Sequence, residues 1–143
     1  MASVKFNYVD RKLSISDKTK LKSFILSLFK NEKTPLNELN YIFCSDEYLL
    51  QINKDHLNHD YYTDIITFSL NEKGESIIGE IYISIDRIKD NAASQNTNLI
   101  NETLRVIFHG CLHLCGYLDK KPKDIKLMRE KEDYYINQYL SLK

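Results

Sequence analysis

Residues 108–119 read FHGCLHLCGYLD, and this segment places His109 and His113 four residues apart. On a helix, two side chains at this spacing project about 40° apart, so both imidazoles can reach one ion. Gly116 allows the helix to end in a left-handed conformation, and the chain can then turn back to offer Asp119 as a third ligand. Around zinc, two imidazoles and a carboxylate leave one position for a water molecule whose pKa falls to roughly 7. The segment therefore predicts a metal site of a hydrolytic type.

The helix that carries this segment has two different faces. Apolar side chains fill one broad arc, which consists of Leu104, Ile107, Phe108, Cys111, Leu114 and Cys115. His109 and His113 lie on the opposite face and so avoid the apolar stripe. The alternative is that both are ordinary core or surface histidines with satisfied hydrogen bonds. The histidine pair, the glycine and the acid together favour the metal site.

Two charged residues share the histidine face at earlier turns of the same helix. We interpret Glu102 as a member of an ordinary helix ion pair. Arg105 has two interpretations, which are a similar ion pair or a catalytic contact to a phosphate group. Arg105 is therefore the catalytic candidate outside the predicted metal ligands.

The cysteines are predicted to pack in the core. Their number is three, and no pair has CxxC spacing, as is typical of reduced thiols in a reducing compartment. Cys111 and Cys115 each lie about 160° around the helix from His113, which directs both thiols away from a shared ion.

Composition and charge favour one globular domain over residues 1–143. The chain is 43% hydrophobic and 28% charged, with 20 basic and 20 acidic side chains, which argues against disorder and against a dedicated nucleic-acid coat protein. The longest uncharged run, residues 106–118, is too short to cross a bilayer, and the start lacks the apolar core of a secretory signal. We therefore expect a cytoplasmic protein without a membrane segment. The sequence has no glycine-rich loop of the kind that holds phosphate groups, so we expect no nucleotide cofactor.

Hydrophobic periodicity predicts an α+β fold, with a small mixed four-stranded sheet and packed helices. The expected strands are residues 4–8, 39–44, 65–70 and 77–85. The expected helices are one that Ser16 or Asp17 caps and that ends before Pro35, a short one that Asp46 caps, a weaker one at 87–99, and two at 101–115 and 122–142. Residues 58–60 are turn-like. The histidine helix is expected near the sheet centre.

Three blocks of the sequence resemble the YbeY family of rRNA-maturation endoribonucleases. The family signature HGxLHLxGYxH is similar to residues 109–119, HGCLHLCGYLD. Residues 63–68, TDIITF, resemble the family's TDVLSF strand, and residues 78–84, IGEIYIS, resemble its GDIxIS strand. The resemblance implies a zincin-like layout and one zinc ion with three protein ligands and a water molecule.

The chain departs from the family pattern at two positions that bear on chemistry. Asp119 stands where the family usually has a third histidine, a change that keeps a zinc-compatible ligand and adds a negative charge. Leu57 stands where the family tends to carry an arginine that is thought to serve the phosphate. The candidate replacements are Arg105, Lys54 and His59.

The resemblance implies a zinc-dependent endoribonuclease that acts on single-stranded rRNA. Its expected roles are 16S rRNA 3′-end processing and ribosome quality control, with the small ribosomal subunit as partner. Because sites of two histidines and an aspartate also accept iron, cobalt or nickel, the metal used in the cell is left open.

Two alternatives remain at this point. The spacing His-x3-His-x2-Gly-x2-Asp is also that of metzincin metallopeptidases, which place a glutamate base directly after the first histidine. Here that position is Gly110, which argues against peptide hydrolysis. The other alternative is a non-catalytic ribosome assembly factor whose C-terminal third is shaped by zinc.

Overall fold

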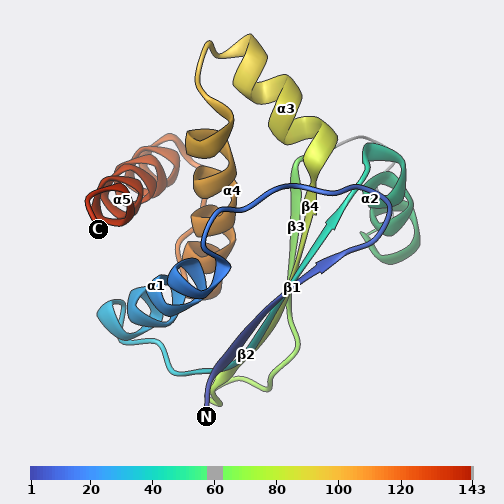
Figure 1. The fold of residues 1–143 in the computed structure, drawn as a ribbon. Coiled ribbons are helices and arrows are strands. Elements are labelled where there is room, and N and C mark those ends of the chain that lie inside the picture. The colour runs from blue at the N-terminus through green and yellow to red at the C-terminus, as the bar shows by residue number, and fades with distance from the viewer. Residues whose placement is uncertain (58–62, 143) are drawn as a thin grey trace.

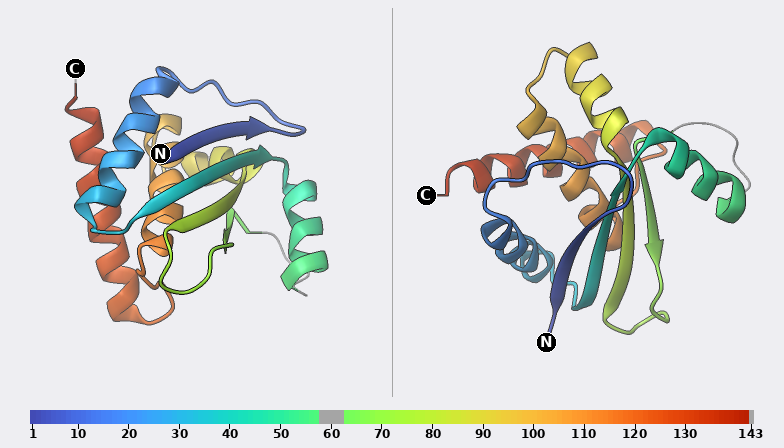
Figure 2. Two further views of the ribbon diagram at one scale, coloured as in Figure 1. Left: turned by 90° about the horizontal axis from the view of Figure 1, so that it is seen from below. Right: turned by 45° about the vertical axis from the view of Figure 1, so that its right-hand side comes forward.

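The computed structural model describes residues 1–57 and 63–142. The turn expected at residues 58–60 and the candidate phosphate contact His59 lie outside the described residues. The strands form a mixed four-stranded sheet, as the sequence predicted, and the structure shows their order to be β1-β2-β4-β3. Three are parallel neighbours, β1 (Ser3–Tyr8), β2 (Leu36–Cys44) and β4 (Ile77–Ser84), and β3 (Ile65–Ser69) runs antiparallel to β4. The right-hand view of Figure 2 shows the four strands side by side.

The helices are α1 (Lys18–Asn31), α2 (Asp46–Ile52), the π-helical turn η1 (Asn53–Leu57), α3 (Ile85–Ser94), α4 (Leu99–Leu114) and α5 (Pro122–Leu140). Figure 1 shows α1, α4 and α5 on one side of the sheet and α2 on the other. Within the described ranges, no helix combines the length and the apolar character needed to cross a bilayer.

Helix capping agrees with the sequence at α1 and differs at α2. Asp17 caps α1, and its carboxylate accepts a hydrogen bond from the Lys20 backbone at 3.1 Å. For α2, the prediction that Asp46 is the cap is wrong, because Ser45 occupies the cap position and its hydroxyl accepts from the Tyr48 backbone at 3.1 Å. Asp46 is instead the first helical residue.

The weaker helix prediction at residues 87–99 had the right element and the wrong bounds. α3 starts at Ile85, directly after β4, because Ser84 caps it and accepts from the Arg87 backbone at 3.2 Å. It ends at Ser94, and Asn98 then caps α4, so Leu99 is the first residue of the histidine helix rather than the last residue of α3.

The histidine helix α4 lies very close to the central strand β4 and the edge strand β3. A Cβ atom added at Gly110 would come within 2.7 Å of Ile81 Cδ1 and 3.1 Å of Ile65 Cδ1. Gly110 thus faces the sheet, in a place where a side chain would force Ile81 to shift. This close packing confirms the predicted position of the helix near the sheet centre.

The thiol of Cys111 points into the core, as predicted. Tyr41 of β2 is fully buried, and its hydroxyl donates to the Ile107 carbonyl at 3.0 Å and lies 2.9 Å from Cys111 Sγ. Burial raises the pKa of the Cys111 thiol above its ordinary range. A buried thiol with a raised pKa is a packing group rather than a metal ligand.

Candidate metal centre

The structure brings the three predicted ligands, His109, His113 and Asp119, to one point. Asp119 Oδ2 lies 3.2 Å from His109 Nε2 and 3.2 Å from His113 Nε2. One ligand atom from each residue falls within 4.8 Å of the others. In a tetrahedral zinc site with bonds of about 2.0–2.1 Å, ligand atoms are about 3.3 Å apart. The donor types and their spacing therefore fit a divalent ion.

A helix-ending turn brings Asp119 back toward the histidines. Gly116 adopts φ 104°, a backbone conformation that favours glycine. Its N–H donates to the His113 carbonyl at 3.0 Å, and the Tyr117 N–H donates to the Leu112 carbonyl at 3.0 Å. These two bonds are those of a Schellman motif, which reverses the chain direction after a helix. The role predicted for Gly116 is confirmed.

The turn is also held from α1 and α5 through Glu32, the residue that ends α1. Glu32 accepts hydrogen bonds from the Tyr117 hydroxyl at 2.7 Å and from the Tyr135 hydroxyl. Lys131 lies 3.4 Å from the same carboxylate. Burial raises the pKa of Glu32, but the two phenols and the Lys131 charge outweigh it, so the pKa lies below its ordinary value. This contact was not expected from the sequence.

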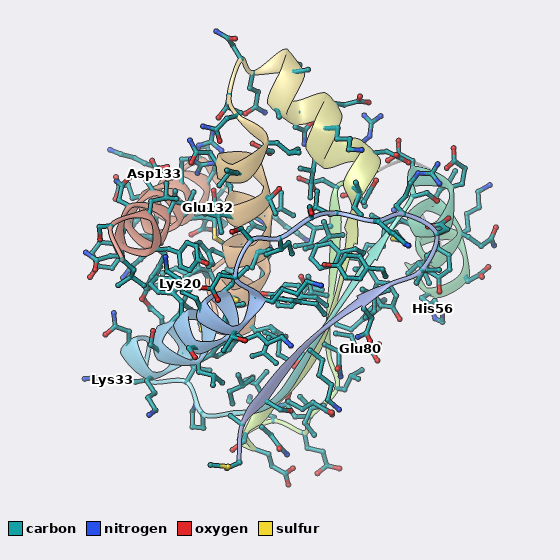
Figure 3. All side chains as sticks on the ribbon, viewed as in Figure 1. Lys20, Lys33, His56, Glu80, Glu132 and Asp133 are labelled. Carbon is teal, nitrogen blue, oxygen red and sulfur yellow. The ribbon has the colours of Figure 1, made fainter. Side chains whose placement is uncertain are left out.

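The second nitrogen of His109 is held by a residue of the last helix. His109 Nδ1 lies 2.6 Å from Glu132 Oε2, and the Glu132 side chain is only 5% exposed. Arg105 Nη1 donates to the other Glu132 oxygen at 2.8 Å, and Arg105 Nη2 donates to Asp133 at 2.6 Å. Figure 3 shows Glu132 between α5 and α4, with Asp133 farther out on α5. Arg105 is thus ion-paired to α5 rather than to its own helix.

These contacts set the pKa of His109 in opposite directions. Burial lowers the pKa of the imidazole, whereas the hydrogen bond and charge of Glu132, followed by the charge of Asp119, raise it. The net effect is a raised pKa. A proton and a metal ion would therefore compete for Nε2, and metal binding at this site is expected to release protons.

A cavity of about 680 Å³ opens beside the three ligands. Its polar walls include the three candidate ligands, Thr63, Asp64, Glu102, Arg105, Arg129 and Glu132. Glu102 is 4% exposed, and across residues 1–57 and 63–142 it has no ion pair, so the helix ion pair predicted for it is wrong. Burial raises the pKa of both Glu102 and Asp64 above the ordinary carboxyl range. Neither acid was recognised as a cavity residue from the sequence.

Comparisons with known proteins assign most of the chain to one family. The family model "Endoribonuclease YbeY" matches residues 5–140. This chain belongs to the YbeY endoribonuclease family. An endoribonuclease YbeY from Cytophaga hutchinsonii is 51% identical over 124 residues, which are 87% of each chain. The endoribonuclease YbeY of Flavobacterium johnsoniae is 41% identical over 136 residues, covering 95% of this chain and 96% of its own length.

A solved structure shows that the fold of this chain also occurs in another protein. The solution structure of TM1509 from Thermotoga maritima has a TM-score of 0.62 and 27% identity, and the match covers 97% of this chain and 89% of that one. The family model and the curated relatives confirm the resemblance drawn from three short sequence blocks.

Two positions that depart from the YbeY pattern have defined places in the backbone. Leu57, where the family tends to carry an arginine, is the last residue of η1, and Lys54 belongs to the same turn. Glu80, which replaces the aspartate of the GDIxIS strand, lies on β4 between two residues that face α4, Gly79 and Ile81. Because strand side chains alternate, Glu80 faces away from the metal centre, and Figure 3 shows it on that side of the sheet.

Proposed function

We propose that this protein is a metal-dependent endoribonuclease that cleaves single-stranded rRNA, working as one domain over residues 1–143. The observation that carries the proposal is the convergence of His109, His113 and Asp119 beside a cavity, in a chain that belongs to the YbeY endoribonuclease family. The proposed ion is Zn²⁺, since nitrogen and carboxylate ligands in a three-residue set suit it. The proposed setting is the cytoplasm, in 16S rRNA 3′-end processing and ribosome quality control on the small subunit.

The three ligands would hold the ion by His109 Nε2, His113 Nε2 and an Asp119 oxygen. A bound zinc ion with an open position supplies an acidified water molecule and stabilises charge on phosphoryl oxygens. The Schellman turn at Gly116 orients the Asp119 carboxylate toward both rings. The protein's part in the chemistry is thus a preformed set of donors on a rigid helix and its capping turn.

Arg105 is proposed to contact the substrate phosphate from the cavity wall. Its guanidinium carries five N–H donors, and the structure engages one on each terminal nitrogen with Glu132 and Asp133. Further donors are therefore available for a phosphate oxygen. The half-buried Asp64 and the buried Glu102 also line the cavity, and in their ionised form they repel phosphate and so favour placing the phosphodiester near the ligands and the arginine.

The peptidase alternative loses support from the packing of α4. In metzincins the residue after the first histidine is the glutamate base, and here Gly110 packs so closely on Ile81 that a side chain would force Ile81 to shift. A base at this sequence position would face the sheet rather than the cavity.

The proposal is tested with purified protein, precursor rRNA and matched single-stranded and duplex RNA. Zinc-loaded protein should cleave the single strands, and chelator or the Asp119→Ala change should abolish cleavage. Cleavage that survives both treatments would exclude the metal mechanism. Zinc binding without cleavage of any RNA would instead support the assembly-factor alternative, and digestion of casein would support a peptidase.

A further inference from the structure

The two histidines of the candidate centre are supported unequally. His109 and His113 both direct Nε2 at Asp119, at 3.2 Å in each case. On the far side of its ring, His109 Nδ1 contacts the Glu132 carboxylate at 2.6 Å. For His113, no hydrogen bond to Nδ1 is recorded from any part of the chain that the structure describes. One ring is therefore held at both nitrogens, and the other depends on its helix and on Asp119.

The chemistry of the Glu132 contact fixes which nitrogen faces the ion. An ionised carboxylate can only accept hydrogen bonds, so Nδ1 must be the donor. In the neutral ring this leaves the lone pair on Nε2, the atom that faces Asp119. A carboxylate behind a metal-binding histidine orients the ring and makes it more basic. Glu132 is placed to do both for His109.

Burying Glu132 requires a counter-charge, and Arg105 supplies it. The Glu132 side chain is 5% exposed, and a buried unpaired carboxylate is strongly unfavourable. Arg105 Nη1 lies 2.8 Å from Glu132 Oε1, while Nη2 reaches Asp133 at 2.6 Å. Arg105 comes from α4, one turn before His109, and both acids come from α5. The three groups Arg105, Glu132 and His109 form a continuous chain between the two helices.

We propose that Glu132 is a positioning residue that holds His109 with Nε2 toward the metal ion, and that Arg105 holds Glu132. This assigns α5 a part in the metal centre, although the three ligands themselves come from α4 and the turn after it. The inference deepens the proposed function and rests on it, because it assumes that the ligands bind an ion. Loss of such an outer contact is expected to weaken metal binding about 10–100-fold.

The test measures zinc affinity by competition with a chromophoric chelator, alongside the thermal stability of the metal-free protein. Glu132→Ala should weaken zinc binding by about 10–100-fold. Glu132→Gln should fall between this variant and the parent, because the amide oxygen can still accept from Nδ1 but carries no charge. The matched control is Glu130→Gln, which removes one negative charge from an exposed position of the same helix and should leave the affinity within about twofold, as is usual for exposed changes.

The outcomes separate this inference from the function on which it rests. If the parent protein binds zinc and cleaves RNA while both Glu132 variants keep the parent affinity, the positioning role is refuted and the proposed function stands. If Glu130→Gln weakens zinc binding as much as Glu132→Gln, the effect is one of general charge, and the inference also fails. A parent protein that binds no divalent ion would overturn the proposed function itself.

A merely structural role for Glu132 predicts a different pattern. In that case Glu132→Gln would lower the unfolding temperature of the metal-free protein, with zinc affinity unchanged in the fraction that stays folded. The expected result is the reverse, with a clear loss of affinity in Glu132→Gln protein that is still folded at the assay temperature. A second readout is ¹⁵N NMR of the imidazole in the metal-free protein at high pH, where neutral His109 should carry its proton on Nδ1 in the parent. Loss of that preference in Glu132→Ala supports the inference, and an unchanged tautomer contradicts it.

Discussion

Asp119 is the carboxylate among the three candidate ligands, and its oxygen lies between the two imidazoles. Asp119→Ala should weaken zinc binding by more than about 100-fold, since even outer contacts to metal ligands are worth about 10–100-fold. Asp119→His should restore much of the affinity, because zinc accepts imidazole nitrogen equally well. The zinc affinity of both variants is measured by titration in an isothermal calorimeter.

The comparison between the two variants decides whether Asp119 acts as a ligand. If Asp119→His binds zinc as weakly as Asp119→Ala, position 119 does not reach the ion and the ligand set is wrong. Asp124→Ala, at a half-buried position in the first turn of α5, is a control for the loss of charge near the site.

Gly110 determines how closely the histidine helix approaches the sheet. Gly110→Ala would place a methyl group 2.7 Å from Ile81 Cδ1, and overpacking of this kind costs about 1–3 kcal/mol. Because the shortest contact is with the end of the Ile81 side chain, Ile81→Val should relieve part of the clash. Urea unfolding of the two single variants and the double variant provides the test.

A double variant that is destabilised by less than the sum of the single changes is the expected result. Simple additivity would mean that Gly110 and Ile81 are not in conflict, and that α4 can move away from β4 at little cost. A glutamate at position 110 would meet the same close contacts.

At the scale of elements, Glu32 connects the end of α1 to the turn after α4 and to α5. Its pKa in the folded protein lies below the ordinary value of 4.5. The ionised carboxylate therefore stabilises the folded state above that pH, and this contribution is lost as the pH falls through the lowered folded-state pKa. Glu32→Gln should lower stability at neutral pH and make stability less dependent on pH below about 4.5.

The free energy of unfolding of the Glu32→Gln variant and the parent is measured by chemical denaturation between pH 3 and 7, in steps of about one pH unit. This range includes the ordinary pKa of a carboxyl group. Glu72→Gln, in the exposed loop between β3 and β4, removes the same charge as a control. A Glu32→Gln variant whose stability falls with acid as steeply as that of the parent contradicts the linkage.

The elements were largely predictable from sequence because their hydrophobic periods are strong. The apolar stripe of α1 has the helical period, and the buried positions of β2 alternate as in a strand. Gly116 correctly indicated the end of α4. The errors fall at the bounds of elements, for example at helix starts, where two polar residues compete for one cap, as Ser45 and Asp46 do. Such choices depend on contacts from elsewhere in the fold. Asp46, for instance, pairs with Arg87 of α3.

The candidate site was predictable only where its residues are close in sequence. The two histidines, the glycine and Asp119 lie within one short segment, whereas Glu132 reaches His109 from the next helix. One signal for Glu132 was present, since it falls in the buried stripe of α5 with Met128, Tyr135, Ile136 and Tyr139. A charged residue in an otherwise apolar stripe requires a buried partner, but periodicity cannot say which one.

For the whole molecule, metal should stabilise a fold that forms without it. The core is a large apolar cluster shared by the sheet and α1, α4 and α5, unlike that of small zinc-dependent domains. Removing zinc should therefore leave the far-ultraviolet circular dichroism nearly unchanged. Saturating zinc at about 100 times its Kd should add about 2.7 kcal/mol to the free energy of unfolding.

Thermal scans with zinc, with chelator and with the Asp119→Ala variant check this prediction. Zinc should raise the unfolding temperature of the parent but not that of the variant. Loss of helix signal on chelation would show that the metal is structural, which is the behaviour expected of the assembly-factor alternative.

The contacts of Glu32 and Glu132 tie the site to the first and last helices, although all three ligands precede α5. During synthesis, a nascent chain that has just emerged as far as Asp119 has every ligand and also Glu32, but it lacks Glu132, which contacts His109, and the α5 residues that contact Glu32. Such a chain would bind metal poorly until translation of α5 is complete. The proposed nuclease would thus reach its full metal affinity only once α5 has been made and has packed against α4.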